Sequence, residues 1–150
     1  MGLERLRGFL RRHRRIALDT SIFIYQLEAN VRYLALTDSI FSWVERPGHE
    51  AVTSTITMTE LLVQPYREHN EGRVDEFYGL LSTYPNLEWI APNLEIADVT
   101  ARIRAIHRLR TPDALQAATA LNARATAFIT NDPVFQRVEE FETALLDLFL

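Results

Sequence analysis

Four acidic residues stand at the edges of the regular elements that the sequence predicts, where a fold can turn carboxylates toward one shared point. Two carboxylates ~4 Å apart repel each other by roughly 1 to 4 kcal/mol, so a cluster of four needs a neutralising cation. Carboxylate oxygens suit Mg²⁺ or Mn²⁺, and such an ion can activate water and neutralise charge on a phosphate. We therefore expect metal-dependent cleavage of phosphodiester bonds by Asp19, Glu60, Asp113 and Asp132.

The positions of these acids in the chain allow them to meet. Asp19 and Asp132 each come directly after a short apolar run that is predicted to be a strand. Sites in open parallel sheets form beyond the carboxyl ends of the strands, so both should point to the same edge. Asp113 lies in the first turn of one predicted helix and Glu60 near the start of another. All four can converge although they are far apart in the sequence.

Each acid taken alone also has a purely structural interpretation. Asp19 can cap the helix after it, and Asp113 can complement a helix dipole. Asp132, which precedes a proline, is typical of a turn, and Glu60 can be a solvated helical glutamate. The joint placement of the four in one small domain favours the site.

Polar residues flank the acids, and they can orient the carboxylates or contact water at a bound ion. Local capping and turn formation explain them equally well. The four histidines show no metal-ligand spacing, and the chain has no cysteine, so a zinc or thiolate site is not expected. The supporting polar candidates are Thr20, Ser21, Thr130 and Asn131.

The basic residues are all arginines, 16 in number, and six of them fall in the first fifteen positions. The guanidinium fork suits phosphate because it donates two hydrogen bonds at once. The basic start can bind RNA, contact a partner or be a solvated extension. A second group lies at the end of a predicted helix, where cations are favourable in any case. Its candidates for contact with RNA are Arg104, Arg108 and Arg110.

Alternating strands and helices predict an α/β fold with a central, mainly parallel sheet and helices on both faces. The segment 1–15 is expected to be a short helix or a loose arm. Pro65 should bend or end its helix near Gln64, and Thr111 should cap the next helix with Pro112 at its first position. Strands are predicted over 15–18, 50–53, 87–90, 128–130 and 144–150, and helices over 21–29, 31–45, 56–64, 73–83, 93–108 and from 112.

Length and composition indicate one soluble globular domain, with 150 residues, 47% hydrophobic and 24% charged. The net charge of −4 argues against a general nucleic-acid coat. The lack of cysteine favours a reducing, cytoplasmic location. No segment is long and apolar enough to cross a membrane, and no convincing signal peptide is present.

The motifs resemble those of PIN-domain ribonucleases, and among them the VapC-like toxins of type II toxin–antitoxin systems. The opening strand and acid match in Ile16-Ala-Leu-Asp-Thr-Ser21, and the second acidic segment matches in 54–63. The most specific match is Leu109-Arg-Thr-Pro-Asp-Ala-Leu-Gln-Ala-Ala-Thr-Ala-Leu121, followed by Ala127-Phe-Ile-Thr-Asn-Asp132. The resemblance covers nearly everything from Ile16 onward, so the expected division is a basic extension over 1–15 and a PIN domain over 16–150.

This resemblance implies a PIN-like fold, Mg²⁺ or Mn²⁺ as cofactor, and endonucleolytic cleavage of single-stranded RNA. It also implies a small antitoxin partner and a homodimer. In the expected mechanism, Asp19, Asp113 and Asp132 hold metal, and Glu60 completes the site or orients water. The number of metals, the RNA target and a toxin rather than a housekeeping role stay open.

Two other classes of function compete with the nuclease. A PIN-like module without metal could bind RNA or assemble a complex, although all four acids are present. Receiver-type and dehalogenase-type phosphoryl transfer, like a P-loop, needs a lysine that this chain lacks.

Overall fold

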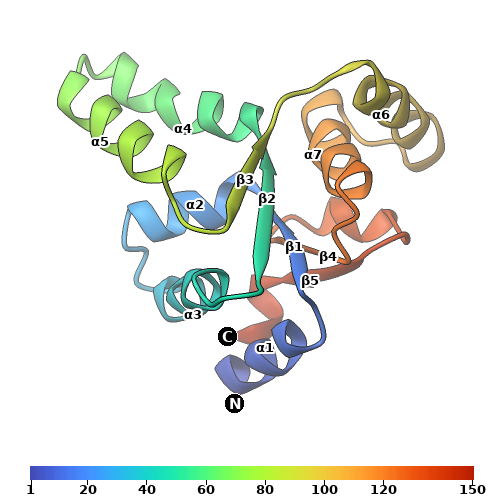
Figure 1. Cartoon of the computed structure of the whole chain (residues 1–150), viewed down its shortest axis with the longest axis horizontal. Coiled ribbons are helices and arrows are strands. Elements are labelled where there is room, and N and C mark those ends of the chain that lie inside the picture. Colours follow the sequence, from blue (N-terminus) through green and yellow to red (C-terminus); the bar gives the residue numbers. More distant parts are fainter.

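The computed structural model describes all 150 residues and is built on one five-stranded sheet with the strand order β3-β2-β1-β4-β5 (Figure 1). Every neighbouring pair of strands runs parallel, which confirms the predicted α/β class. The strands are β1 (Arg15–Leu18), β2 (Glu50–Ser54), β3 (Leu87–Ile90), β4 (Ala127–Thr130) and β5 (Glu142–Leu145).

The central strand β1 lies between β2 and β4, and this arrangement brings three chain segments to one sheet edge. Ala17 of β1 is in register with Val52 on one side and with Phe128 on the other. All of β4 is buried, as expected for a strand covered on both faces. The carboxyl ends of β1, β2 and β4 are therefore neighbours, and the residues that follow them share a surface.

Helices cover both faces of the sheet and enclose two hydrophobic clusters (Figure 1). One cluster joins the first three helices to the sheet, and the other packs α6 and α7 against β4. No helix is long and apolar enough to span a bilayer. The helices are α1 (Gly2–Arg11), α2 (Thr20–Leu27), α3 (Leu34–Val44), α4 (Thr55–Arg67), α5 (Glu71–Ser82), α6 (Leu94–His107) and α7 (Thr111–Asn122).

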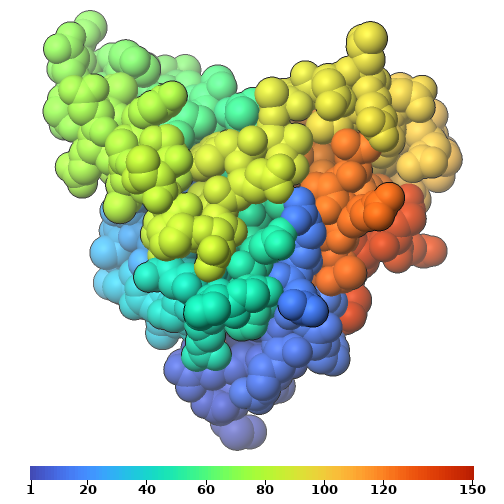
Figure 2. All heavy atoms as spheres, viewed as in Figure 1, coloured from blue at the N-terminus to red at the C-terminus, as the bar shows by residue number.

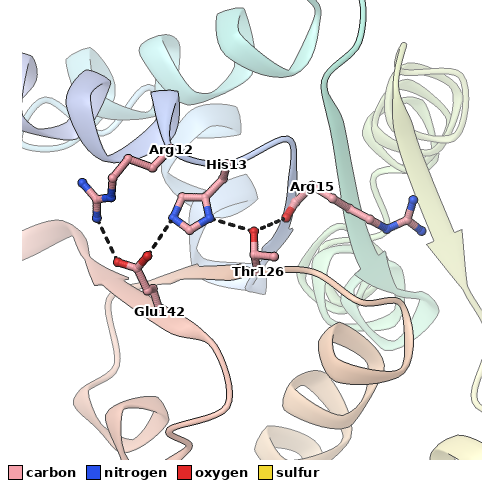
Figure 3. A network of polar contacts seen from close by, with 5 residues as sticks. All are labelled: Arg12, His13, Arg15, Thr126 and Glu142. Carbon is pink, nitrogen blue, oxygen red and sulfur yellow. Dashed lines mark hydrogen bonds and ion pairs between the residues drawn. The ribbon is translucent and has the colours of Figure 1, made fainter.

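The helix α1 is packed into the fold and is not a loose arm. Leu6 and Leu10 are buried in the larger hydrophobic cluster. In the residues that follow the helix, Arg12 forms an ion pair with Glu142 at 2.8 Å. His13 Nδ1 lies 2.7 Å from Thr126 Oγ1 (Figure 3). Burial lowers the pKa of His13. These contacts tie the basic start of the chain to the amino ends of β4 and β5.

The strand expected over 144–150 is wrong in its bounds. The residues that pair with β4 are Glu142 to Leu145, and a 3₁₀ helix (Leu146–Phe149) follows. The ladder ends because β4 itself ends at Thr130, so later residues have no strand to pair with.

The predicted effect of Pro65 is also wrong, because α4 continues to Arg67. A proline removes its own N–H donor but leaves the carbonyls before it free to accept from later residues. The Glu68 N–H donates to the Gln64 carbonyl at 3.0 Å, which keeps the last turn helical.

The start of α7 differs from the prediction by one residue. Arg110 is the N-cap without a side-chain bond, Thr111 is already helical and Pro112 follows it. Asp113 still lies in the first turn, as expected.

Candidate active site

Asp19 stands directly beyond β1, where hydrogen bonds fix both oxygens of its carboxylate. Oδ1 accepts from the Thr20 N–H at 2.8 Å, and Oδ2 accepts from the Thr130 hydroxyl at 2.7 Å. The Ser21 hydroxyl lies at 3.4 Å from Oδ2, which is a weaker contact. Asp19 therefore caps α2 and is also held from β4, so its structural role and its proposed role coexist.

Asp132 is linked to Asp19 by hydrogen bonds through Thr130. The Thr130 hydroxyl oxygen accepts from the Asp132 N–H at 3.1 Å while its proton goes to Asp19. The Asp132 carboxylate accepts from the Val134 N–H at 3.0 Å and caps a short 3₁₀ helix (Pro133–Arg137). Thr130 thus links the acids that follow β1 and β4.

Glu60 and Asp113 reach the site from helices. Glu60 lies in the second turn of α4, and its Oε1 accepts from the Thr20 hydroxyl at 2.7 Å. Asp113 lies in the first turn of α7 and is partly buried. The residue that follows Asp19 is therefore bonded to Glu60, and this bond connects two of the four acids.

The charges of neighbouring carboxylates act on Asp19 and Asp113. Burial raises the pKa of Asp19 to about 6, and the charges of Glu60 and Asp113 add to this rise against the opposing hydrogen bonds from Thr130 and Thr20. Burial also raises the pKa of Asp113, and the charges of Asp132 and Glu60 add to the rise while Arg110 opposes it. The sheet edge therefore carries mutually repelling carboxylates.

The four acids offer the oxygen ligands that a hard divalent cation prefers, but their side chains are not arranged as a coordination shell. All four side chains offer carboxylate oxygens, and none forms an ion pair with an arginine or histidine. In this conformation, no group of three or more histidine, aspartate and glutamate side chains is placed to hold a metal ion. Holding an ion would therefore require the acids to rotate toward one another, a change that their mutual repulsion opposes and that the charge of a cation would favour.

A buried polar network behind the acids was not anticipated from the sequence. Thr53, Thr57 and Gln116 are each at most 4% exposed, and they bond to one another and to Thr20. The available signal was spacing: Thr57 precedes Glu60 by three residues and Gln116 follows Asp113 by three, so each shares a helix face with an acid.

Asn131 does not join the acids. Its amide donates to the Tyr25 hydroxyl at 3.2 Å, and its carbonyl accepts from the Asp147 N–H at 2.9 Å. It fastens α2 to the chain end and is a structural residue in this conformation.

The three arginine candidates lie beside the site without filling it. Arg104, Arg108 and Arg110 are exposed and form no ion pair. Arg108 ends α6 in the left-handed conformation with φ 59°, and Arg110 is close enough to Asp113 to influence its carboxyl. Arg104 Nε donates to the Leu109 carbonyl at 3.3 Å, and no carboxylate pairs with any of the three guanidinium groups, so they can still meet an anion.

The surface is hollowed beside Glu60. Figure 2 shows a notch between the lobe of α4 and α5 and the lobe that begins with α6. A groove of about 420 Å³ between α2, α4 and α5 includes Glu60 in its wall. The other residues that line this groove include the apolar Ile24, Leu27 and Phe77 and the charged Glu28, Glu68, Arg73 and Glu76.

Comparison with known proteins gives a family match and several matches of fold. The family model described as PIN domain matches residues 16–141. Among curated protein sequences, none matches the chain significantly. Three solved structures share the fold, each aligned over 87% of this chain.

The first is a toxin–antitoxin complex from Klebsiella pneumoniae, with 23% identity, a TM-score of 0.64 and 97% of that chain covered. The second is VapBC2 from Rickettsia felis bound to a DNA fragment from its promoter, with 18% identity, a TM-score of 0.63 and 98% covered. The third is FitAcB from Neisseria gonorrhoeae, with 19% identity, a TM-score of 0.68 and 97% covered. At these identities the likeness establishes the fold.

Proposed function

The chain belongs to the PIN domain family, and from this premise we propose that it is a metal-dependent endoribonuclease. PIN domains are generally nucleases, which supports hydrolysis of phosphodiester bonds. The observation that carries the proposal is the set of coupled carboxylates at the carboxyl edge of the sheet, where like charges help to raise the pKa of Asp19 and Asp113. A cation would relieve this repulsion.

In the proposed mechanism, Asp19, Asp113 and Asp132 hold Mg²⁺ or Mn²⁺, with Glu60 completing the site or orienting the attacking water. Such an ion supplies an activated water and neutralises charge on the phosphate. Thr130 and Thr20 keep the Asp19 carboxylate facing the site through its two fixed oxygens. Ser21 supports the same carboxylate more weakly.

RNA would approach the notch with its backbone along the α6–α7 connection. The exposed guanidinium groups of Arg104, Arg108 and Arg110 have no competing carboxylate partner, so they can contact phosphates. This placement puts cations next to the acidic centre, where they offset the repulsion between carboxylates and a polyanionic substrate.

The biological setting that we favour is a VapC-like toxin held inactive in the cytoplasm by a small antitoxin. The similar solved structures are toxin–antitoxin assemblies, which supports a protein partner and the toxin role. We also propose a homodimer. Arrest of bacterial growth by induced expression, with rescue by the adjacent upstream gene, tests the toxin role. Normal growth during verified expression would contradict it.

The direct test of nuclease activity is incubation of the purified protein with structured and single-stranded RNA, with Mn²⁺ and with EDTA. We expect internal cleavage of single-stranded RNA that EDTA abolishes. Cleavage that persists in EDTA would refute the proposed chemistry, and Asp113→Asn serves as the inactive control.

A catalytically inactive RNA-binding or assembly module is the second candidate. The observation in its favour is that the acids are not gathered into a metal-holding group in this conformation. The same incubation, with RNA binding measured beside cleavage, separates the two functions, because a module would bind RNA in Mn²⁺ without cutting it.

A further inference from the structure

The buried network behind the acids has a fixed direction of donation. The Thr53 hydroxyl lies 3.0 Å from the Leu18 carbonyl, which can only accept, so its proton goes there. The Thr57 hydroxyl, 2.8 Å from Thr53 Oγ1, must then donate to Thr53. Each hydroxyl has a single proton, so both protons of this branch are committed.

The second branch of the network ends at Glu60, one of the four acids. Thr20 Oγ1 lies 2.7 Å from Glu60 Oε1, and an ionised carboxylate only accepts, so the Thr20 proton goes to Glu60. Thr20 and Thr57 are 3.1 Å apart, but no proton is left to lie between them. Their two oxygens face each other and need a donor from elsewhere.

Gln116 supplies that donor to both branches. Its Nε2 lies 2.8 Å from Thr57 Oγ1 and 3.3 Å from Thr20 Oγ1, and an amide nitrogen carries two protons. The side chain is only 4% exposed, so water does not readily replace it. If the amide were flipped, its carbonyl oxygen would face the hydroxyl oxygens of Thr20 and Thr57. Neither hydroxyl has a proton left to donate to it.

This arrangement joins the elements that carry three of the acids. Gln116 stands one turn after Asp113 on α7, and Thr57 one turn before Glu60 on α4. Thr20 follows Asp19 at the start of α2. One amide thus connects the helix of Asp113 with the hydroxyl that holds Glu60.

We propose that Gln116 is a positioning residue, which through Thr20 and Thr57 fixes the Glu60 carboxylate relative to Asp19 and Asp113. This inference rests on the proposed nuclease function. Gln116 touches neither substrate nor ion, and it acts by keeping the Thr20 hydroxyl oriented as a donor to Glu60. Partners that orient metal-binding side chains commonly contribute 10- to 100-fold to metal affinity or activity.

The test compares Gln116→Leu and Gln116→Glu with a matched control on the same helix. Leucine removes both donors at similar size, whereas an ionised glutamate would compete for the protons of Thr20 and Thr57. The control is Thr119→Val, because Thr119 is equally buried and its hydroxyl bonds only to the Leu115 carbonyl of its own helix. Mn²⁺ affinity by calorimetry, the EPR spectrum of bound Mn²⁺ and thermal unfolding without metal are measured for each protein.

We expect both Gln116 variants to lower Mn²⁺ affinity by about 10- to 100-fold and to change the Mn²⁺ EPR spectrum, while Thr119→Val leaves both as in the wild type. In a Glu60→Gln background the effect of Gln116→Leu on affinity should largely vanish, because Gln116 acts through Glu60. An equal loss of affinity in both backgrounds, or in Thr119→Val, would overturn the proposal. Failure of the wild type to bind Mn²⁺ or cleave RNA would instead refute the proposed function.

Discussion

At the scale of single residues, Asp19 shows how a site costs stability when its charge is not compensated. Its pKa is about 6 in the folded protein against 3.8 for an unperturbed carboxyl, chiefly because burial disfavours the charge. The folded state therefore binds a proton more tightly than the unfolded state. The cost is absent below pH 4, grows as pH rises toward 6 and is fully present above pH 6.

We predict that Asp19→Asn stabilises the metal-free protein at pH 7 by about 1–3 kcal/mol, because one pKa unit corresponds to ~1.4 kcal/mol. Urea unfolding of both proteins at pH 4 and pH 7 measures the difference. The gain should shrink toward pH 4, where the wild-type carboxyl is protonated. The comparison between variants cancels the contribution of His13, whose lowered pKa acts in the opposite direction. Equal free energies of unfolding for the two proteins at pH 7 would contradict a destabilising charge on Asp19.

The hydroxyl of Thr20 gives a second residue-scale prediction. Thr20→Val removes the donor to Glu60 at nearly constant size, whereas Thr20→Ser keeps it. We expect RNA cleavage by the valine variant to fall about 10- to 100-fold and cleavage by the serine variant to stay within a few-fold of wild type. Equal losses in the two variants would show that the methyl packing of Thr20, and not its hydroxyl, matters.

At the scale of elements, the sequence predicts the structure that depends on short motifs. Short apolar runs such as 16–18 and 127–130 favour buried parallel strands, and the prediction that Asp19 and Asp132 follow strands is confirmed. Buried polar residues were not found, because Thr57 and Gln116 lie in segments that read as ordinary helix. Only the packing of α4 against α7 and β2 reveals that their side chains face one another.

The helix α1 is the element whose role the sequence left most open. Its residues lie outside the matched family segment, yet Leu10 is 1% exposed and packs in the main hydrophobic cluster. We predict that Leu10→Ala lowers the free energy of unfolding by about 2–5 kcal/mol, as for other buried leucines. Exposed Arg14→Gln is the control and should change stability by less than about 0.5 kcal/mol. A small effect of Leu10→Ala in urea unfolding would mean that α1 is a dispensable extension.

At the scale of the whole molecule, the candidate site lies at only one end of the sheet. The acids gather at the carboxyl ends of the strands, whereas α1 and the end of α3 lie at the amino ends (Figure 1). Arginines occur at both ends, since Arg11 and Arg46 line a groove of about 390 Å³ between α1 and α3. The two groups of arginine offer a test of where RNA lies.

We predict that Arg104→Gln combined with Arg108→Gln weakens RNA binding in EDTA and lowers the slope of log affinity against log salt by about 0.7 for each lost phosphate contact. The matched control is Arg11→Gln with Arg46→Gln, which removes the same charge from the opposite edge and also breaks no ion pair. Fluorescence anisotropy with labelled single-stranded RNA measures both. A larger loss in the control pair would place the RNA on the α1–α3 groove instead.

We propose above all that the acids of α4 and α7 and those that follow β1 and β4 form one divalent-cation site. Calorimetric titration of Mn²⁺ into the wild-type protein, Asp113→Asn and the surface variant Asp98→Asn tests it most directly. We predict saturable binding by the wild type and by Asp98→Asn, and a loss of at least about tenfold in affinity for Asp113→Asn. The absence of saturable binding by the wild type, or undiminished binding by Asp113→Asn, would contradict it.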